Sequence, residues 1–366
     1  MSAVYLGGMG LACALGETLA SSLETLRGGG VLPAPVAVSA DAASRWPVYA
    51  LPPIEGDWKE RVRRRVRAVV AQADAAGGAV ARTAPLFVAS SSLDVGDMEH
   101  EPHGRRLGGD LLDFADIVAE ALGWRGPVFT VSTACTSSLN AILSACDLLR
   151  GGEAIEALVI GAEPDNRFTV AGFGAMQLLS PDAARPFGAG RNGLVLGEAF
   201  AALHLTTRPA RWRIAGGANV VDGSNPAGNE AGAVRTMCEA ALAQAGLQPG
   251  DIDLIKVQAA GSPGNDAVEA LALKAVFDPL PPLVSFKPAI GHTLGASGAA
   301  ELALLAGCIA HGAWPAAGHP VDPALGMALG VCAPPRLRHV LFNVLGFGGG
   351  HAALVLEDRE AEEMAS

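Results

Sequence analysis

Residues 131–138 read Val-Ser-Thr-Ala-Cys-Thr-Ser-Ser, and an apolar helical pattern follows directly, to about Arg150. The preceding run, residues 126–132, has the apolar character of a buried strand. The turn between them places Cys135 at a helix N-terminus, where the helix dipole and unpaired N–H groups favour thiolate. Small neighbours such as Ala134 leave the sulfur approachable. The sequence therefore predicts one reactive cysteine on an α/β frame.

Short strand-like runs alternate with helical patterns along the chain. Strands are expected at residues 3–6, 85–89, 128–132, 157–161, 200–205, 212–218, 254–258, 283–285, 339–344 and 352–356. Helices are expected at residues 19–26, 58–75, 111–122, 137–149, 170–176, 232–245, 266–276 and 296–311. This alternation predicts mostly parallel sheets covered by helices. Because it restarts near residue 210, we expect two similar halves, residues 1–208 and 209–366.

The composition excludes several classes of protein. Of the 366 residues, 50% are hydrophobic and 17% are charged, which argues against disorder. A net charge of −11 argues against general nucleic-acid binding. No unbroken apolar run is long enough to cross a bilayer. The apolar N-terminus has no lysine or arginine before Arg27 and is interrupted by glycines, so it predicts a strand and a turn and not a signal peptide.

The six cysteines are scattered, and none forms a Cys-x-x-Cys pair. This spacing does not favour a structural zinc site, so we expect no metal. Most of them fall in apolar helical patterns, where a free thiol acts as a small core residue. Such cysteine usage fits the reducing cytoplasm.

One helical stretch is strongly basic in an otherwise acidic chain. Its cationic side chains are Lys59, Arg61, Arg63, Arg64, Arg65 and Arg67. The simpler interpretation is a solvated helix face, and the functional one is a docking surface for an acidic partner.

Two further motifs are rich in glycine. Residues 285–301 read Ser-Phe-Lys-Pro-Ala-Ile-Gly-His-Thr-Leu-Gly-Ala-Ser-Gly-Ala-Ala-Glu, and residues 343–351 read Asn-Val-Leu-Gly-Phe-Gly-Gly-Gly-His. Together with Thr-Ala-Cys-Thr-Ser-Ser, and in this order, they resemble the β-ketoacyl-acyl-carrier-protein synthases, the type I/II ketosynthases of the thiolase superfamily. The resemblance runs from Tyr5 to Glu357.

The resemblance implies a thiolase fold, with two pseudo-equivalent halves in five layers, α-β-α-β-α. It also implies dimerisation through the strand before the nucleophile, near residues 128–131. The implied reaction has two steps. A cysteine takes an acyl group from a carrier protein, and malonyl-carrier protein then loses carbon dioxide so that its carbanion attacks the acyl thioester.

The resemblance also assigns roles to individual residues. Cys135 matches the nucleophile, and its own N–H with that of Phe347 matches the oxyanion hole. Phe347 also matches the aromatic gate residue. His292 matches an active-site histidine that donates to the malonyl thioester carbonyl. Lys287 and Glu301 match a buried pair that supports this histidine.

One position departs from the family pattern. Residues 257–266 read Val-Gln-Ala-Ala-Gly-Ser-Pro-Gly-Asn-Asp, where the family carries His-Gly-Thr-x-Thr-Pro-x-Asn-Asp. Ala260 stands where the first active-site histidine belongs, and the loop is shorter. Losing one donor to a developing oxyanion costs a factor of about 10² to 10³ in rate. The sequence therefore predicts that the nucleophile is retained and the condensing apparatus is incomplete.

The sequence favours a ketosynthase-family acyltransferase for chain elongation in fatty-acid or polyketide assembly. We expect it to need no cofactor, to take acyl groups from an acyl carrier protein and to work with a ketosynthase dimer partner. Because acyl carrier proteins are acidic, the docking interpretation of the basic helix gains weight. Two alternatives stay open: a chain-length-factor-like subunit that does not condense, or a cysteine acyltransferase or thioesterase.

Overall fold

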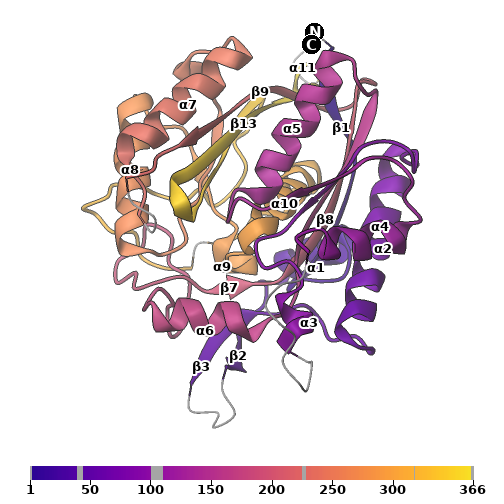
Figure 1. Ribbon diagram of the computed structural model, residues 1–366. Coiled ribbons are helices and arrows are strands. Elements are labelled where there is room, and N and C mark those ends of the chain that lie inside the picture. Colours follow the sequence, from indigo (N-terminus) through magenta and orange to yellow (C-terminus); the bar gives the residue numbers. More distant parts are fainter. Residues whose placement is uncertain (1, 39–43, 100–109, 225–227, 317, 364–366) are drawn as a thin grey trace.

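A computed structural model describes residues 2–38, 44–99, 110–224, 228–316 and 318–363 (Figure 1). The strands are β1 (Val4–Cys13), β2 (Ala34–Ala37), β3 (Arg45–Tyr49), β4 (Leu86–Ala89), β5 (Val128–Val131), β6 (Glu156–Glu163), β7 (Leu196–Gly197), β8 (Ala199–Thr206), β9 (Trp212–Val221), β10 (Leu254–Lys256), β11 (Leu283–Val284), β12 (His339–Leu345) and β13 (Gly350–Asp358). The helices are α1 (Leu19–Arg27), α2 (Trp58–Gly77), α3 (Val95–Glu99), α4 (Asp113–Leu122), α5 (Ser137–Gly151), α6 (Arg167–Ala175), α7 (Ala231–Ala245), α8 (Pro263–Val276), α9 (Lys287–Ile290), α10 (Ser297–His311) and α11 (Glu360–Glu363).

The large sheet repeats one strand order twice. Its ten strands run β11-β10-β12-β13-β9-β1-β8-β6-β4-β5. From the seam between β1 and β9 outward, one half has the order β1-β8-β6-β4-β5 and the other has the order β9-β13-β12-β10-β11. In both halves, the strands that come first, fifth, fourth, second and third along the chain therefore follow one another. In both halves the two outer pairings are parallel and the inner ones antiparallel. At the seam, residues 4–6 pair with residues 212–214.

Helices and half-sheets alternate in layers (Figure 1). The helices α2 and α4 cover the outer face of the β1–β8–β6–β4–β5 half, and α7 and α8 cover the outer face of the other half. Between the half-sheets lie α5 and α10, which contact each other and strands of both halves. The arrangement is the five-layer α-β-α-β-α order that the sequence led us to expect.

The two kinds of helix differ in sequence because they occupy different layers. In the outer helix α2, the buried residues Trp58, Val62, Val66 and Val69 recur at helical spacing, and Asp57 caps its N-terminus. The central helix α10 is buried through twelve consecutive residues from its start at Ser297. The segment Leu294–His311 is long and apolar enough to cross a bilayer, but 83% of it is buried inside this protein. Its apolar composition therefore reflects its place in the core.

The central helices approach closely near their N-termini. A Cβ on Gly298 would lie 2.7 Å from the backbone nitrogen of Leu139, so the contact admits only glycine without a shift. The hydroxyl of Ser138 accepts a hydrogen bond from the N–H of Ala299 at 3.0 Å. This contact holds the start of α5 against the start of α10.

Candidate active site

The turn before α5 fixes the position of Cys135. Ala134 has a left-handed backbone with φ of 52°, a conformation that residues other than glycine rarely adopt. The hydroxyl of Ser137 accepts a hydrogen bond from the N–H of Thr133 at 2.9 Å and donates to the carbonyl of Ala134 at 2.6 Å. These bonds hold the sharp change of direction from β5 into α5, which presents Cys135 at the start of the helix.

The thiol of Cys135 is buried, and this changes its expected ionisation. Burial raises the pKa of Cys135 to about 11, although the charge of Lys287 and the N–H groups of Phe347 and of Cys135 itself act to lower it. Burial therefore favours the thiol as the resting form and opposes the thiolate that a helix N-terminus would favour. The desolvation of the sulfur outweighs the charge of Lys287 and the two N–H groups. Both amide groups expected to form the oxyanion hole do point at this sulfur.

His292 lies in the same site, between α9 and α10. Its ring is buried, and burial together with the charges of Lys287 and Lys256 holds its pKa well below the usual value. The Nδ1 atom accepts the N–H of Leu294 at 3.1 Å and lies 3.2 Å from the hydroxyl of Ser297. A ring nitrogen that accepts an N–H bond carries no proton, so the neutral ring has its proton on Nε2.

The supporting charges form a triad and not the expected pair. One carboxylate oxygen of Glu301 pairs with Lys287, and the other lies 2.7 Å from the ammonium group of Lys256. All three side chains are fully buried. Lys256 also donates to the carbonyl of Asn343 at 2.9 Å and lies 4.2 Å from the centre of the Phe342 ring. The sequence analysis did not identify Lys256.

The two lysines dominate the electrostatics around Glu301. Burial disfavours its carboxylate, but the charges of Lys256 and Lys287 hold the pKa of Glu301 below its usual value. Burial lowers the pKa of Lys256 to about 8. Burial of the ring, reinforced by the charges of Lys287 and Lys256, keeps His292 neutral.

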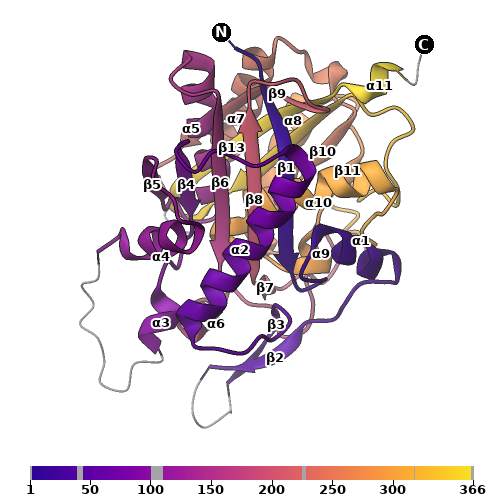
Figure 2. The ribbon, with the colours of Figure 1, turned by 90° about the vertical axis from the view of Figure 1, so that its right-hand side faces the viewer.

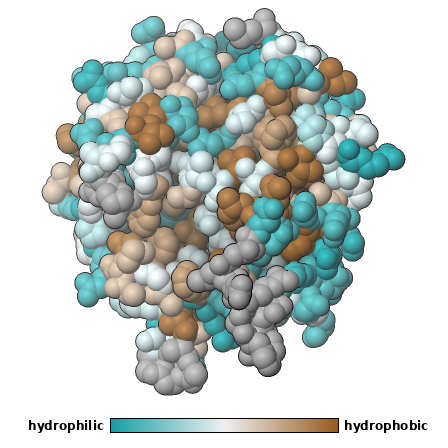
Figure 3. Space-filling model, in the orientation of Figure 1, coloured by the Kyte–Doolittle hydropathy of each residue, from teal (hydrophilic) through white to brown (hydrophobic). Residues whose placement is uncertain are grey.

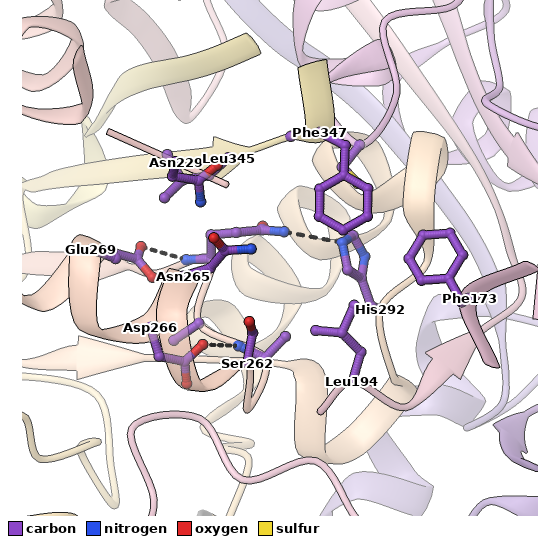
Figure 4. Close-up of a pocket in the computed structure, with 15 residues that line it drawn as sticks. Phe173, Leu194, Asn229, Ser262, Asn265, Asp266, Glu269, His292, Leu345 and Phe347 are labelled. Carbon is purple, nitrogen blue, oxygen red and sulfur yellow. Dashed lines mark hydrogen bonds between the residues drawn. The ribbon is translucent and has the colours of Figure 1, made fainter. Parts of the chain in front are cut away.

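A small cavity of about 30 Å³ joins the predicted site residues (Figure 4). Its lining includes Cys135, His292, Phe347 and Ala260. A water needs roughly 10–15 Å³ of such space, so the cavity has room for about two waters. Ala260, the position at which the sequence resemblance leads us to expect an imidazole, lines this cavity with a methyl group.

The loop that carries Ala260 is held by two buried carboxyl groups. Asp266 accepts the N–H groups of Ala260 at 3.2 Å and of Gly261 at 3.1 Å. Glu269 accepts the N–H of Gln258 at 2.7 Å. The side-chain amide of Gln258 lies 3.2 Å from Nε2 of His292, as a dashed line in Figure 4 marks. Gln258 is a second site residue that the sequence analysis did not identify.

Glu163, at the end of β6, links the two halves at the site. Its buried carboxyl group accepts the N–H of Ser92 at 3.0 Å and that of Gly295 at 2.9 Å. Burial raises its pKa. Because Gly295 lies between His292 and α10, Glu163 ties the histidine loop to the half that carries Cys135.

A larger cavity of about 280 Å³ lies on the other side of two aromatic rings. Phe173 from α6 and Phe347 border both cavities, and Cys135 also borders both. The larger cavity has a mostly apolar lining that includes Leu294, Phe168 and Met176. The side chains of Phe168 and Met176 are exposed at 70% and 55%. The site thus offers an apolar space that leads from the surface to the thiol.

The basic helix is α2, and its cationic residues differ in availability. Arg65 is 6% exposed, pairs with Glu17 at 2.8 Å and donates to the carbonyl of Pro52. Because its guanidinium is used inside the protein, Arg65 does not belong to a docking surface, and this part of the expectation is corrected.

The other cations of α2 reach the surface to different extents. Lys59 pairs with Asp97 at 2.9 Å, Arg61 with Asp165 at 2.8 Å and Arg63 with Glu120 at 3.9 Å. Arg64 and Arg67 are exposed and donate to the backbone carbonyls of Glu55 and Ala121, both at 2.9 Å. Carbonyl oxygens leave the charge of a guanidinium available, so Arg64 and Arg67 retain the most usable positive charge.

The described residues include no group of three or more His, Cys, Asp or Glu side chains arranged to hold a metal ion.

Comparisons with known proteins identify the family of this chain. The chain matches the models "Beta-ketoacyl synthase, N-terminal domain" at residues 98–210 and "Beta-ketoacyl synthase, C-terminal domain" at residues 213–320. Nodulation protein E of Rhizobium sp. (strain N33) is 34% identical over 65% of this chain and 63% of its own length. A Streptomyces cyaneus relative, named as a polyketide beta-ketoacyl synthase 1, is 32% identical over 79% of this chain and 75% of its own length.

A solved structure confirms the predicted fold. The ketosynthase in complex with its chain length factor from Xenorhabdus doucetiae aligns with 98% of each chain, a TM-score of 0.81 and 27% identity. The predicted thiolase fold is therefore confirmed, as is the family resemblance. The chain belongs to the β-ketoacyl synthase family.

Proposed function

We propose that this protein is an acyl-accepting β-ketoacyl synthase for chain elongation in fatty-acid or polyketide assembly. The observation that carries this proposal is the surrounding of Cys135. Its sulfur receives the N–H groups of Phe347 and of Cys135 itself, and it shares a cavity with the neutral ring of His292. An oxyanion formed at a thioester carbonyl beside the sulfur meets these donors.

In the first step, the sulfur of Cys135 bonds to the acyl carbon of a carrier-protein thioester. The carrier C–S bond breaks, and the proton of the thiol goes to the departing carrier thiolate. In the second step, the carboxylate of malonyl-carrier protein leaves as carbon dioxide, and the electron pair passes to the thioester enolate. The enolate carbon then attacks the acyl carbon, and Cys135 leaves as a thiolate that regains a proton from water.

The acyl chain has a fitting location in the apolar cavity beside Phe173. This cavity reaches Cys135 and has room for a chain of several methylene groups. Each methylene group moved out of water contributes about 0.8 kcal/mol to binding. The malonyl group is proposed to reach His292 in the smaller cavity, which has to widen to admit it because it has room for only about two waters.

Mass spectrometry of the purified protein tests this function. Incubation with an acyl-carrier protein is expected to add the acyl mass to Cys135. Cys135→Ala abolishes the adduct, whereas Cys332→Ala at the exposed free cysteine retains it. No adduct, with or without a co-expressed ketosynthase, refutes acyl acceptance.

The carrier protein is proposed to approach α2. The first residue of this helix contacts the segment before α6, since Trp58 donates to the carbonyl of Asp165 at 3.0 Å. Figure 2 shows α2 lying across the outer face of its half-sheet. The helix α6 carries Phe173, which borders the site. Arg63, Arg64 and Arg67 thus offer positive charge on a helix whose first residue touches the segment that leads into α6.

A ketosynthase-family partner is proposed to cover the edge of the sheet at β5. This strand ends the strand order, and Phe129 is 40% exposed while it stacks on Phe87 at 4.8 Å. Figure 3 shows hydrophobic residues gathered on the face that α5 crosses in Figure 1. An exposed parallel edge invites pairing with another chain. The Xenorhabdus ketosynthase, which is bound to its chain length factor, supports a heterodimer as one form of this partnership.

A non-condensing, chain-length-factor-like role is the second candidate, and Ala260 is the observation that favours it. The cavity at Ala260 lacks the family's first imidazole. Malonyl decarboxylation by the isolated protein would refute this candidate. Under either candidate we propose the reducing cytoplasm as the location, in agreement with six free thiols.

A further inference from the structure

The side-chain amide of Gln258 and the ring of His292 face each other with two hydrogen-bond donors and no acceptor. The Nδ1 atom of His292 accepts the N–H of Leu294 at 3.1 Å, so the ring proton is on Nε2. The nearest amide atom of Gln258, at 3.2 Å from this Nε2, is its nitrogen, which is also a donor. The amide oxygen of Gln258 is buried without a hydrogen-bond partner. Two donors do not bond, and a buried acceptor without a partner costs about 1–3 kcal/mol.

A half-turn of the amide removes the contact between two donors and leaves a buried NH₂ group in place of the unpartnered oxygen. The oxygen of Gln258 then accepts the Nε2 proton of His292. Gln258 is 7% exposed and lines the cavity that contains Cys135 and Ala260. The NH₂ group then takes the position of an oxygen that meets no hydrogen-bond donor, in the cavity where the thioester is proposed to bind.

We propose that Gln258 is a catalytic residue, whose amide NH₂ donates a hydrogen bond to the malonyl thioester oxygen in place of the imidazole absent at Ala260. This inference rests on the proposed function. As carbon dioxide leaves, the electron pair of the broken C–C bond moves into the thioester enolate. The enolate oxygen then accepts hydrogen bonds from the NH₂ group of Gln258 and from Nε2 of His292. His292 thereby gives up its hydrogen bond to the amide oxygen of Gln258 and donates to the substrate oxygen.

The backbone around Gln258 suits this role. Its N–H donates to Glu269 at 2.7 Å, and Glu269 also accepts the side-chain amide of Asn343 at 3.0 Å. Glu269 is fully buried. A donor on a fixed backbone needs little reorganisation as the oxyanion forms.

The test compares two substitutions that separate donating from positioning. Gln258→Glu retains an acceptor for His292 and loses the NH₂ donor, whereas Gln258→Met conserves the volume and loses both. Each is incubated with malonyl-carrier protein, with any co-purifying partner held constant, and the release of carbon dioxide and acetyl-carrier protein is measured. Gln244→Met makes the same change at an exposed position on α7.

Both Gln258 variants are expected to lose decarboxylation by about 10² to 10³-fold, while Gln244→Met retains it and all acylate Cys135. If Gln258→Glu keeps the rate, Gln258 only positions His292 and the proposal is wrong. A wild-type protein that acylates Cys135 and does not decarboxylate overturns it as well. If wild type does not acylate Cys135, the proposed function itself fails, so the two failures are distinguishable.

Discussion

The ring of Phe173 stacks on the ring of Phe347, with centroids 5.5 Å apart and planes inclined by 16°. The pair borders both the small cavity at His292 and the larger apolar cavity. It therefore forms a partition between the space proposed for the malonyl group and the space proposed for the acyl chain.

Removing one ring of this partition should expose an acyl group on Cys135 to water. An aromatic pair contributes about 1 kcal/mol beyond its burial, which corresponds to a factor of about five in an equilibrium. Without this stabilisation, the arrangement that excludes water is expected to be about fivefold less populated. Water should therefore hydrolyse the acyl-Cys135 thioester about fivefold faster in Phe173→Ala, as measured by decay of the acyl mass. Phe168→Ala, at an exposed rim residue, serves as the control. Equal decay in both variants would show that the stacked pair is no partition.

The raised pKa of Cys135 predicts the pH dependence of its alkylation. With a folded pKa of about 11, the thiolate fraction is small at neutral pH and grows with pH. The rate of alkylation by iodoacetamide should rise about tenfold per pH unit from about pH 7 to about pH 10, without a plateau. Peptide mass spectrometry follows Cys135, with exposed Cys332 as a reference in the same sample. A plateau near neutral pH would mean that the thiolate is stabilised after all.

The buried triad predicts unequal effects of removing its members. Glu301→Gln leaves two buried ammonium groups without a counter-charge, so it should lower the free energy of unfolding by about 3–5 kcal/mol. Lys256→Met leaves Glu301 paired with Lys287 and should cost less. Urea unfolding of both variants measures the difference. Equal losses would contradict a shared carboxylate between the two lysines.

Charge reversal on α2 tests the docking surface. The combined variant Arg63→Glu, Arg64→Glu and Arg67→Glu should raise the KM for acyl-carrier protein and weaken its salt dependence. Transfer from a small acyl thioester should be unchanged, because the site itself is intact. Arg235→Glu, on the exposed surface of α7, is the control. A similar KM in all three proteins would return α2 to the interpretation of a solvated face.

The edge strand β5 predicts a dependence on a partner. Phe129→Asp places a charge on the exposed edge and should convert the protein to a monomer in light scattering, or release a co-purified ketosynthase. Val331→Asp, at another exposed apolar residue, should leave the assembly unchanged. An unaltered assembly in Phe129→Asp would place the interface elsewhere.

Most of the frame could be predicted from the sequence because burial follows periodicity. The strand ranges at residues 128–132 and 157–161 correspond to β5 and β6, and the helix at residues 232–245 corresponds to α7. The small sheet of β2, β3 and β7 was missed. Its strands are short, and β2 and β3 contain Pro35 and Pro47, which argue against strands.

The site was predictable only where a motif carried it. Cys135 and His292 lie in motifs, whereas Lys256 and Gln258 receive their roles from distant partners. Lys256 is charged in a buried strand because Glu301 faces it from α10. The sequence offered one sign of their roles, which is that two polar residues, Lys256 and Gln258, interrupt an apolar strand pattern. Polar residues in such a pattern are usually expected to face solvent.

The close contact at Gly298 means that the packing of two helices, and not the conformation of two loops, sets the distance between Cys135 and His292. Cys135 follows the third strand of one half and His292 the third strand of the other. The starts of α5 and α10 then meet at Gly298 and Leu139. A methyl group at Gly298 would push the two helices apart. It would thus change the distance between Cys135 and His292 without altering any residue that lines the site. The spacing of the reacting groups is thus adjustable from a core position that lines neither cavity.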